Sequence, residues 1–234
     1  MHTASSQYLE TAATDERAQF IRRTYFHLAL AILAFAGLEA YLLQQPYTAK
    51  LIELMAGTRY SWLAVLGAFM AVSWIADRWA RSTVSPAVQY LGLVLYILAE
   101  AIIFLPLLDL ATRHSSPDLL KNAALLTGTL FAGLTFVVFT TRKDFSFLGG
   151  VLKIGFFVTL GLIGASILFG FTLGLIFSGA MILMASASIL YSTSNVLREY
   201  RTTQHVAAAL ALFASVALLF WYVLRLLMQL TGRD

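Results

Sequence analysis

Long apolar runs separated by short polar stretches predict seven helices that cross a membrane. A helix needs about 20 residues to span a bilayer core about 30 Å thick, and each run reaches roughly that length. Strands are disfavoured because the runs are continuously apolar and about twice as long as a barrel strand. We therefore predict an all-α membrane protein, with a polar N-terminal tail at residues 1–23 and a seven-helix transmembrane bundle at 24–230. The predicted spans are 24–44, 61–78, 86–108, 122–141, 147–168, 171–191 and 205–230.

The composition agrees with this interpretation and excludes several kinds of chemistry. Hydrophobic residues make up 59% of the 234 residues and charged residues 12%, with a mean hydropathy of +0.79. Soluble domains carry about twice that share of charge. The chain has no cysteine, which excludes disulfides, thiolate catalysis, iron–sulfur clusters and cysteine-ligated zinc within it.

The basic residues indicate how the spans are oriented. The net charge is +4, but Lys and Arg occur singly or in pairs in short loops, which is typical of topology signals rather than nucleic-acid binding. A cytosolic N-terminus places ten of them inside and six outside, so we predict a cytosolic N-terminus and a periplasmic C-terminus. The ten are Arg17, Arg22, Arg23, Arg78, Arg81, Arg142, Lys143, Lys153, Arg198 and Arg201, and the six are Lys50, Arg59, Arg113, Lys121, Arg225 and Arg233.

Two local patterns predict further structure. The acidic residues of the tail argue against a cleaved signal peptide, and we expect the tail to be helical from Thr14 into the first span. Only Phe169 and Gly170 separate the fifth span from the sixth, which predicts a tight hairpin. Glycines are expected to bring the two backbones of this hairpin close together. They stand at positions 155, 161, 164, 170, 174 and 179.

Motifs for catalysis are absent from the sequence. It contains no HExxH, GxSxG, Walker A or dinucleotide-binding glycine fingerprint. The histidines His2, His27, His114 and His205 stand alone, without a second ligand three or four residues away. The last span has no lysine to form a retinal Schiff base. We therefore expect no enzyme activity, no metal site, no cofactor and no nucleic-acid partner.

Two glutamates inside the apolar runs are candidates for function, because ionisable groups are costly at that depth. Glu39 and Glu100 lie at the same predicted height, about 21–23 Å from the cytosolic end of their helices. If they face one another, one of them is expected to hold a proton, and the pair can bind a cation or sense pH. In the alternative interpretation, Arg225 of the last span neutralises one glutamate in a salt bridge. The polar run Tyr191–Asn195 likewise has two interpretations, a helix terminus or a ligand site.

Four segments together resemble the Bax inhibitor-1 family, and most closely its bacterial YccA-like branch. They are the junction TTRKDFSFLGG at 140–150, RRTYF at 22–26, Glu100 followed by Pro106, and ILYSTSN at 189–195. The final Gly-Arg-Asp, residues 232–234, also resembles this branch, and the similarity spans essentially the whole chain. The residues that match the junction motif are Thr141, Arg142, Lys143, Asp144, Phe145, Gly149 and Gly150.

This resemblance implies an inner-membrane bundle of six helices around a central seventh. It also implies one of two functions: a pH-sensitive calcium or proton leak, or, in the YccA-like branch, binding of the membrane protease FtsH. The family's leak depends on two aspartates, whose matching positions here are Ser192 and Ser215. Two hydroxyls neither share a proton nor attract a divalent cation as two carboxylates do. The resemblance therefore favours a regulator that binds FtsH, while Glu39 and Glu100 keep the leak open as the alternative.

Overall fold

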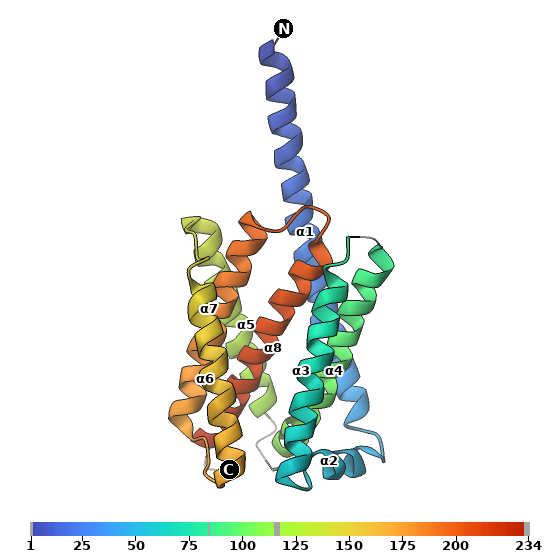
Figure 1. The fold of residues 1–234 in the computed structure, drawn as a ribbon, viewed down its shortest axis with the longest axis vertical. Helices are drawn as coiled ribbons and strands as arrows, with labels where there is room; N and C mark the ends of the chain where they lie inside the picture. Colours follow the sequence, from blue (N-terminus) through green and yellow to red (C-terminus); the bar gives the residue numbers. More distant parts are fainter. Residues whose placement is uncertain (1, 84, 115–117, 232–234) are drawn as a thin grey trace.

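A computed structural model describes residues 2–83, 85–114 and 118–231 of the protein (Figure 1). The regular elements in these residues are all helices, and seven of them are long and apolar enough to cross a membrane. This confirms the predicted class. The helices are α1 His2–Leu42, α2 Thr48–Ala56, α3 Arg59–Ala80, α4 Pro86–His114, α5 Leu119–Thr141, α6 Leu148–Phe169, α7 Leu175–Arg198 and α8 His205–Leu230.

The last span, α8, is the central helix of the bundle, as the family resemblance implied. It packs against α1, α3, α4, α5 and α7, and in Figure 1 it crosses obliquely between the α6–α7 side and the α3–α4 side. Its first turns present small side chains, Ala207, Ala208 and Ala209, which are completely buried. Small residues let neighbouring helices approach closely, so this part of α8 is enclosed on every side.

The α6–α7 hairpin forms, but only part of the predicted glycine set lies close to the partner helix. The chain turns at Gly170, whose φ of 76° is left-handed, and α7 begins only at Leu175. A Cβ added at Gly161, Gly164 or Gly179 would meet no atom within 4 Å. Helix α6 has no buried residue, because it lies at the outside of the bundle. The expectation of close contact is therefore wrong at Gly161, Gly164 and Gly179. At Gly155, by contrast, the backbone of α6 lies close to α7, because an added Cβ would stand 2.6 Å from Met184 Sδ.

Helix α2 was not predicted by the pattern of spans. It is a helix of nine residues between α1 and α3, at the end of the bundle opposite the start of α1 (Figure 1). The hydroxyl of Thr48 donates to the carbonyl of Leu42, which fixes the turn between α1 and α2. Thr48 and Met55 are its buried residues. The helix is too short to cross a bilayer, so it does not produce an apolar run of spanning length in the sequence.

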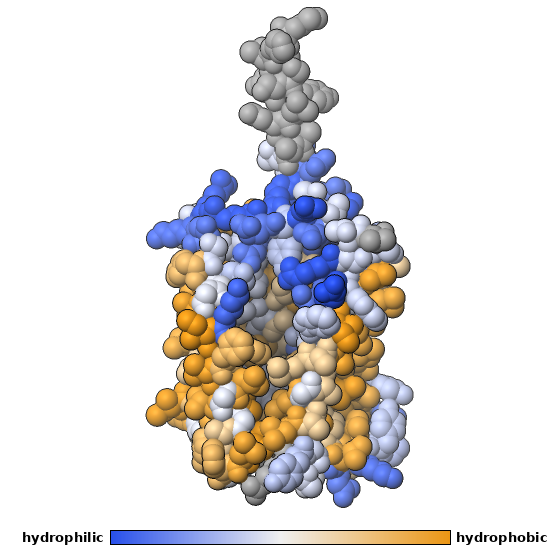
Figure 2. All heavy atoms as spheres, viewed as in Figure 1, coloured by the Kyte–Doolittle hydropathy of each residue, from blue (hydrophilic) through white to orange (hydrophobic). Residues whose placement is uncertain are grey.

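The two ends of the bundle differ in polarity. Helix α1 starts at His2, earlier than the expected Thr14, and projects beyond the other helices (Figure 1). Figure 2 shows hydrophilic residues gathered at this same end and an apolar belt below it. The order of the helices brings all ten predicted cytosolic cations to this end. Of the opposite set, the side chain of Arg59 and all of 232–234, with Arg233, lie outside the described residues.

Candidate functional site

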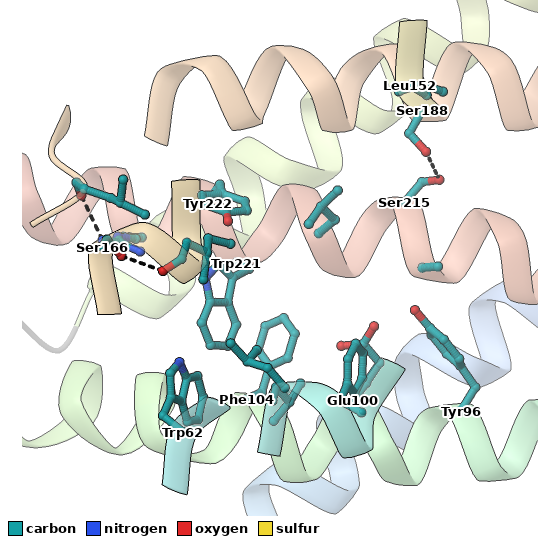
Figure 3. Close-up of a pocket in the computed structure, with 18 of the residues that line it drawn as sticks. Trp62, Tyr96, Glu100, Phe104, Leu152, Ser166, Ser188, Ser215, Trp221 and Tyr222 are labelled. Atoms are coloured by element: carbon teal, nitrogen blue, oxygen red, sulfur yellow. Dashed lines mark hydrogen bonds between the residues drawn. The ribbon is translucent and has the colours of Figure 1, made fainter. Parts of the chain in front are cut away.

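A cavity of about 680 Å³ lies within the bundle between α3, α4, α6, α7 and α8 (Figure 3). Most of its wall is apolar or aromatic, and the hydroxyl and charged groups come from α4, α6, α7 and α8 and from the turn between α6 and α7. Glu100 projects into it from α4, Ser166 lies on α6, and the other serines lie on α7 and α8. Arg225 stands near the C-terminal end of α8. The aromatic side chains that line it are Trp62, Phe69, Tyr96, Phe104, Phe171, Tyr191, Trp221 and Tyr222.

The two glutamates predicted to share a depth are both buried. Glu100 is 6% exposed and lies one turn after Tyr96 on the face of α4 that borders the cavity. Glu39, on α1, is 4% exposed, and neither of its carboxyl oxygens has a hydrogen-bond partner. Helices α1 and α4 pack together, and the two carboxyl groups are close enough for their charges to interact. The structure therefore brings together two acids that are 61 positions apart in the sequence.

Arg225 does not neutralise either glutamate, so the salt-bridge interpretation is wrong. Its Nη2 donates to the carbonyl of Leu173 at 2.8 Å. That carbonyl lies in the turn between α6 and α7, where no helical N–H reaches it, and it therefore attracts the guanidinium. Among the described residues, the ion pairs lie within single helices, Asp77 with Arg81 and Asp109 with Arg113. Within this part of the chain, Glu39 and Glu100 have no cationic partner.

The positions matched to the family's aspartate pair lie side by side. The hydroxyl oxygens of Ser192 and Ser215 are 3.3 Å apart, and Ser188 Oγ is 2.8 Å from Ser215 Oγ (Figure 3). Ser215 also donates to the carbonyl of Ala211 at 2.9 Å, so the other two hydroxyls donate to Ser215. A hydroxyl has one donor and two acceptor sites, and all three are used here. We call Ser188, Ser192 and Ser215 the serine trio.

The sequence pattern did not single out Ser188, although its spacing from Ser192 contained a signal for it. It precedes Ser192 by four residues and therefore lies on the same face of α7. The trio is a neutral, self-satisfied cluster. It offers no carboxylate to a divalent cation, which prefers charged oxygen ligands.

The family junction between α5 and α6 is fastened to the end of α7. The backbone N–H of Phe145 donates to Ser194 Oγ at 3.1 Å, and Arg198 donates to the carbonyl of Arg142. Arg142 itself ends α5 in the left-handed conformation, with φ 51°. Helix α7 continues to Arg198, past the predicted end at 191, so Tyr191–Asn195 lies within the helix and not at its terminus. Its Ser194 holds a neighbouring loop.

Other junction residues shape the loop itself. Asp144 Oδ1 accepts the backbone N–H of Ser146 at 2.8 Å, and this bond lowers the pKa of Asp144 below its usual range. The backbone of Gly149 lies against the ring of Tyr191, so a larger residue there would clash with that ring. The remaining junction residues Thr141, Lys143 and Gly150 are exposed.

Two of the histidines that stand alone in the sequence meet in the fold. His27 Nε2 lies 3.0 Å from the hydroxyl of Tyr90, which is 3.4 Å from His205 Nε2. The two imidazole ring centroids are 5.0 Å apart. They stand alone along the sequence but not in space, because α1, α4 and α8 converge at the polar end of the bundle. Sequence spacing within one helix carries no signal for such a contact.

The fold and the cavity define a multi-pass α-helical membrane protein with two buried acids in its interior. A family profile described as "Inhibitor of apoptosis-promoting Bax1" matches residues 17–232. The chain therefore belongs to this family, in agreement with the resemblance of its junction motif.

Bacterial relatives share most of the chain. A protein of Pseudomonas aeruginosa is 30% identical over 233 residues, 97% of each chain. The Escherichia coli protein named "Modulator of FtsH protease YccA", and in another strain "Inner membrane protein YccA", is 30% identical over 210 residues, 88% of each chain. No solved structure matches. The apolar helices and the Escherichia coli relative together support a multi-pass protein of the inner membrane, embedded in the lipid bilayer.

Proposed function

We propose that this protein modulates the membrane protease FtsH by binding it, and thereby affects the quality control of membrane proteins. The observation that carries the proposal is the similarity to the relative named modulator of FtsH over 88% of both chains. The serine trio supports it, because the positions matched to the leak's acid pair are neutral and saturated. A protein that acts by binding FtsH needs no pair of ionisable side chains at the positions of Ser192 and Ser215.

Two surfaces suit such a role. Helix α1 extends beyond the bundle and offers a segment at the polar end, which is the cytosolic end in our proposed orientation (Figure 1). Helix α6 exposes large apolar side chains such as Ile154 and Phe157, each 69% exposed. Such a face is able to pack against a partner helix within the bilayer.

Co-purification of FtsH with the full chain tests this proposal. Deletion of residues 2–13 removes the projecting part of α1 and leaves the apolar part, which begins at Thr14. We expect this deletion to abolish co-purification and to accelerate the turnover of FtsH substrates. The control variant replaces the same residues with an unrelated helix-forming sequence. Unchanged FtsH binding after the deletion, together with unchanged substrate turnover in a strain lacking the protein, would contradict the proposal.

The second candidate is a calcium or proton leak, which one observation favours. Glu39 and Glu100 are buried without a cationic partner in the described residues, and Glu100 borders the cavity. Reconstituted vesicles with a calcium dye separate the two candidates. We expect no flux between about pH 5 and 8 from the natural chain. The double variant Ser192→Asp with Ser215→Asp restores an acid pair and is the positive comparison.

A further inference from the structure

The cavity contains a strong candidate for binding an organic cation, and the first reason is charge. Glu100 is more than nine-tenths buried, projects into the cavity, and has no ion pair in the described part of the chain. Glu39, whose carboxyl oxygens have no hydrogen-bond partner, lies close behind it on α1. An acid enclosed in an apolar site is stabilised by a cationic partner. The protein does not supply that partner among the residues described.

The second reason is the chemistry of the walls. Around the depth of Glu100 the cavity is bordered by the rings of Tyr96 and Phe104, and Trp62 and Trp221 lie further along it (Figure 3). Aromatic faces attract ammonium groups, and the attraction grows when the cation is desolvated. The volume of about 680 Å³ lies in the range that holds a drug-sized molecule, and the rest of the wall is apolar.

Two of the other polar groups of the cavity, Arg225 and Ser215, do not compete for this role. Arg225 is engaged with the carbonyl of Leu173, and the hydroxyl of Ser215 is saturated by its neighbours. A small metal ion needs several oxygen ligands converging on one point. No group of three or more His, Cys, Asp or Glu side chains with that geometry occurs in the described residues. A single acid with aromatic neighbours suits a large organic cation instead.

Access also favours a lipophilic ligand. Figure 2 shows this face of the molecule hollowed within the apolar belt, with hydrophobic residues on both sides of the hollow. A molecule that partitions into the bilayer would therefore arrive at the level of the cavity.

We propose that the cavity binds a lipophilic ammonium compound, with its charged nitrogen beside Glu100 and its apolar body between Trp62, Phe104 and Trp221. This site is separate from the surfaces proposed to meet FtsH. Deletion of residues 2–13 should therefore leave amine binding unchanged, and failure of one proposal does not imply failure of the other.

N-dodecylpyridinium is the probe for this proposal, because its charge is permanent and its ring quenches indole fluorescence. The full chain carries four tryptophans, and Trp74 and Trp79 lie outside the cavity. In nanodiscs, the variant with Trp74→Phe and Trp79→Phe leaves only Trp62 and Trp221 to report binding. We expect saturable quenching that dodecyltrimethylammonium reverses and that dodecanol or dodecyl sulfate does not.

Two variants then locate the site. Glu100→Gln should weaken binding at least tenfold, while Glu53→Gln, the same change at an exposed acid of α2, should leave it unchanged. Ala214→Phe fills the cavity from α8 with Glu100 intact and should also weaken binding at least tenfold. Both variants are first checked by gel filtration and thermal unfolding, and Ala214→Phe decides the matter if Glu100→Gln does not fold. Equal affinity in the natural chain and in a folded variant, or equal displacement by dodecanol, would overturn the proposal.

Discussion

At the scale of single residues, Asp144 shows how the family junction acts outside the membrane. Its carboxylate accepts the backbone N–H of Ser146 at 2.8 Å, and that bond, followed by the Ser146 hydroxyl and the charge of Arg198, lowers its pKa. Because the folded pKa is lowered, this stabilisation is present above the ordinary value of 3.8 and is lost as pH falls through the folded value.

We predict that the carboxyl carbon of Asp144 titrates below 3.8 in a carbon-13 NMR titration of the folded protein. Asp144→Asn keeps an oxygen for the Ser146 N–H but has no charge, so the loop should become insensitive to pH in this range. The exposed Asp118, at the start of α5, serves as the comparison carboxyl in the same spectra. A titration of Asp144 at or above 3.8 would contradict the assigned bond.

Single polar residues inside apolar runs were the part of the site that the sequence could reveal. Glu39, Glu100, Ser192 and Ser215 interrupt hydrophobic surroundings, and such interruptions are visible without a fold. Their partners were not visible, because contacts between helices depend on how each helix is rotated. The Leu173 carbonyl that holds Arg225 has no side-chain signal at all.

At the scale of elements, the close approach of α3 and α4 depends on Gly92. A Cβ at this position would lie 2.5 Å from the carbonyl oxygen of Ala76 and 2.6 Å from the backbone nitrogen of Ala80. The obstacle is backbone, which cannot rotate away as a side chain can. Gly92→Ala should therefore force α3 and α4 apart and destabilise the bundle by about 1–3 kcal/mol.

Thermal unfolding in detergent measures this effect, and Gly37→Ala is the matched control. Gly37 is exposed within α1, five residues before the helix ends at Leu42, and a Cβ there meets nothing within 4 Å. Helical glycine is less stable than alanine by about 0.5–1 kcal/mol, so the control should stabilise slightly. The two identical substitutions thus have opposite expected signs. A stabilised Gly92→Ala protein would show that α3 and α4 are not in this contact.

Arg17 joins two elements that are far apart in the sequence. Its Nη1 donates to the carbonyl of Tyr200 at 2.5 Å and its Nη2 to that of Val196 at 2.6 Å, so α1 is tied to the end of α7. Arg17→Ala leaves both carbonyls without this donor. We predict faster hydrogen exchange at 196–200 and a loss of about 1.5–3 kcal/mol in unfolding free energy.

Arg17→Lys should recover only part of this loss, because a lysine lacks the planar fork that reaches both carbonyls. Arg22→Ala, at an exposed position one turn further on, is the control for lost charge and should leave exchange at 196–200 unchanged. Equal exchange rates in the Arg17→Ala and natural proteins would count against the anchor.

The length and hydropathy of the apolar runs predicted that the seven spanning helices exist. They did not predict which helices lie in the core of the bundle and which lie at its surface. Helices α6 and α8 are similarly apolar, yet α6 has no buried residue and α8 is largely enclosed. In a bilayer, lipid and protein interior are both apolar, so hydropathy does not distinguish a surface helix from a core helix. The small residues of α8 indicate part of its central position, and the family resemblance supplied the rest.

The expectation that the chain is not an enzyme stays a prediction.

At the scale of the whole molecule, the seven spans place the start of α1 and the end of α8 at opposite ends of the bundle. Polar residues gather at the end from which α1 projects (Figure 2). That end also carries the ten basic residues of the larger set, including Arg142 and Lys143 in the α5–α6 loop. Basic loops are retained in the cytosol, so this end should face inward.

We predict that alkaline phosphatase fused after residue 231 is active, because the C-terminal end of α8 lies in the periplasm. A green fluorescent protein fused at the same point should be dark. The matched control is a fusion after Lys143, within the predicted cytosolic loop, where the fluorescence should be bright and the phosphatase inactive. The reverse pattern at both points would place the N-terminal end of α1 outside the cell membrane, in the periplasm. The proposed contact of α1 with FtsH at the cytosolic end would then have to be abandoned, whereas the amine site, which lies within the bilayer, would be unaffected.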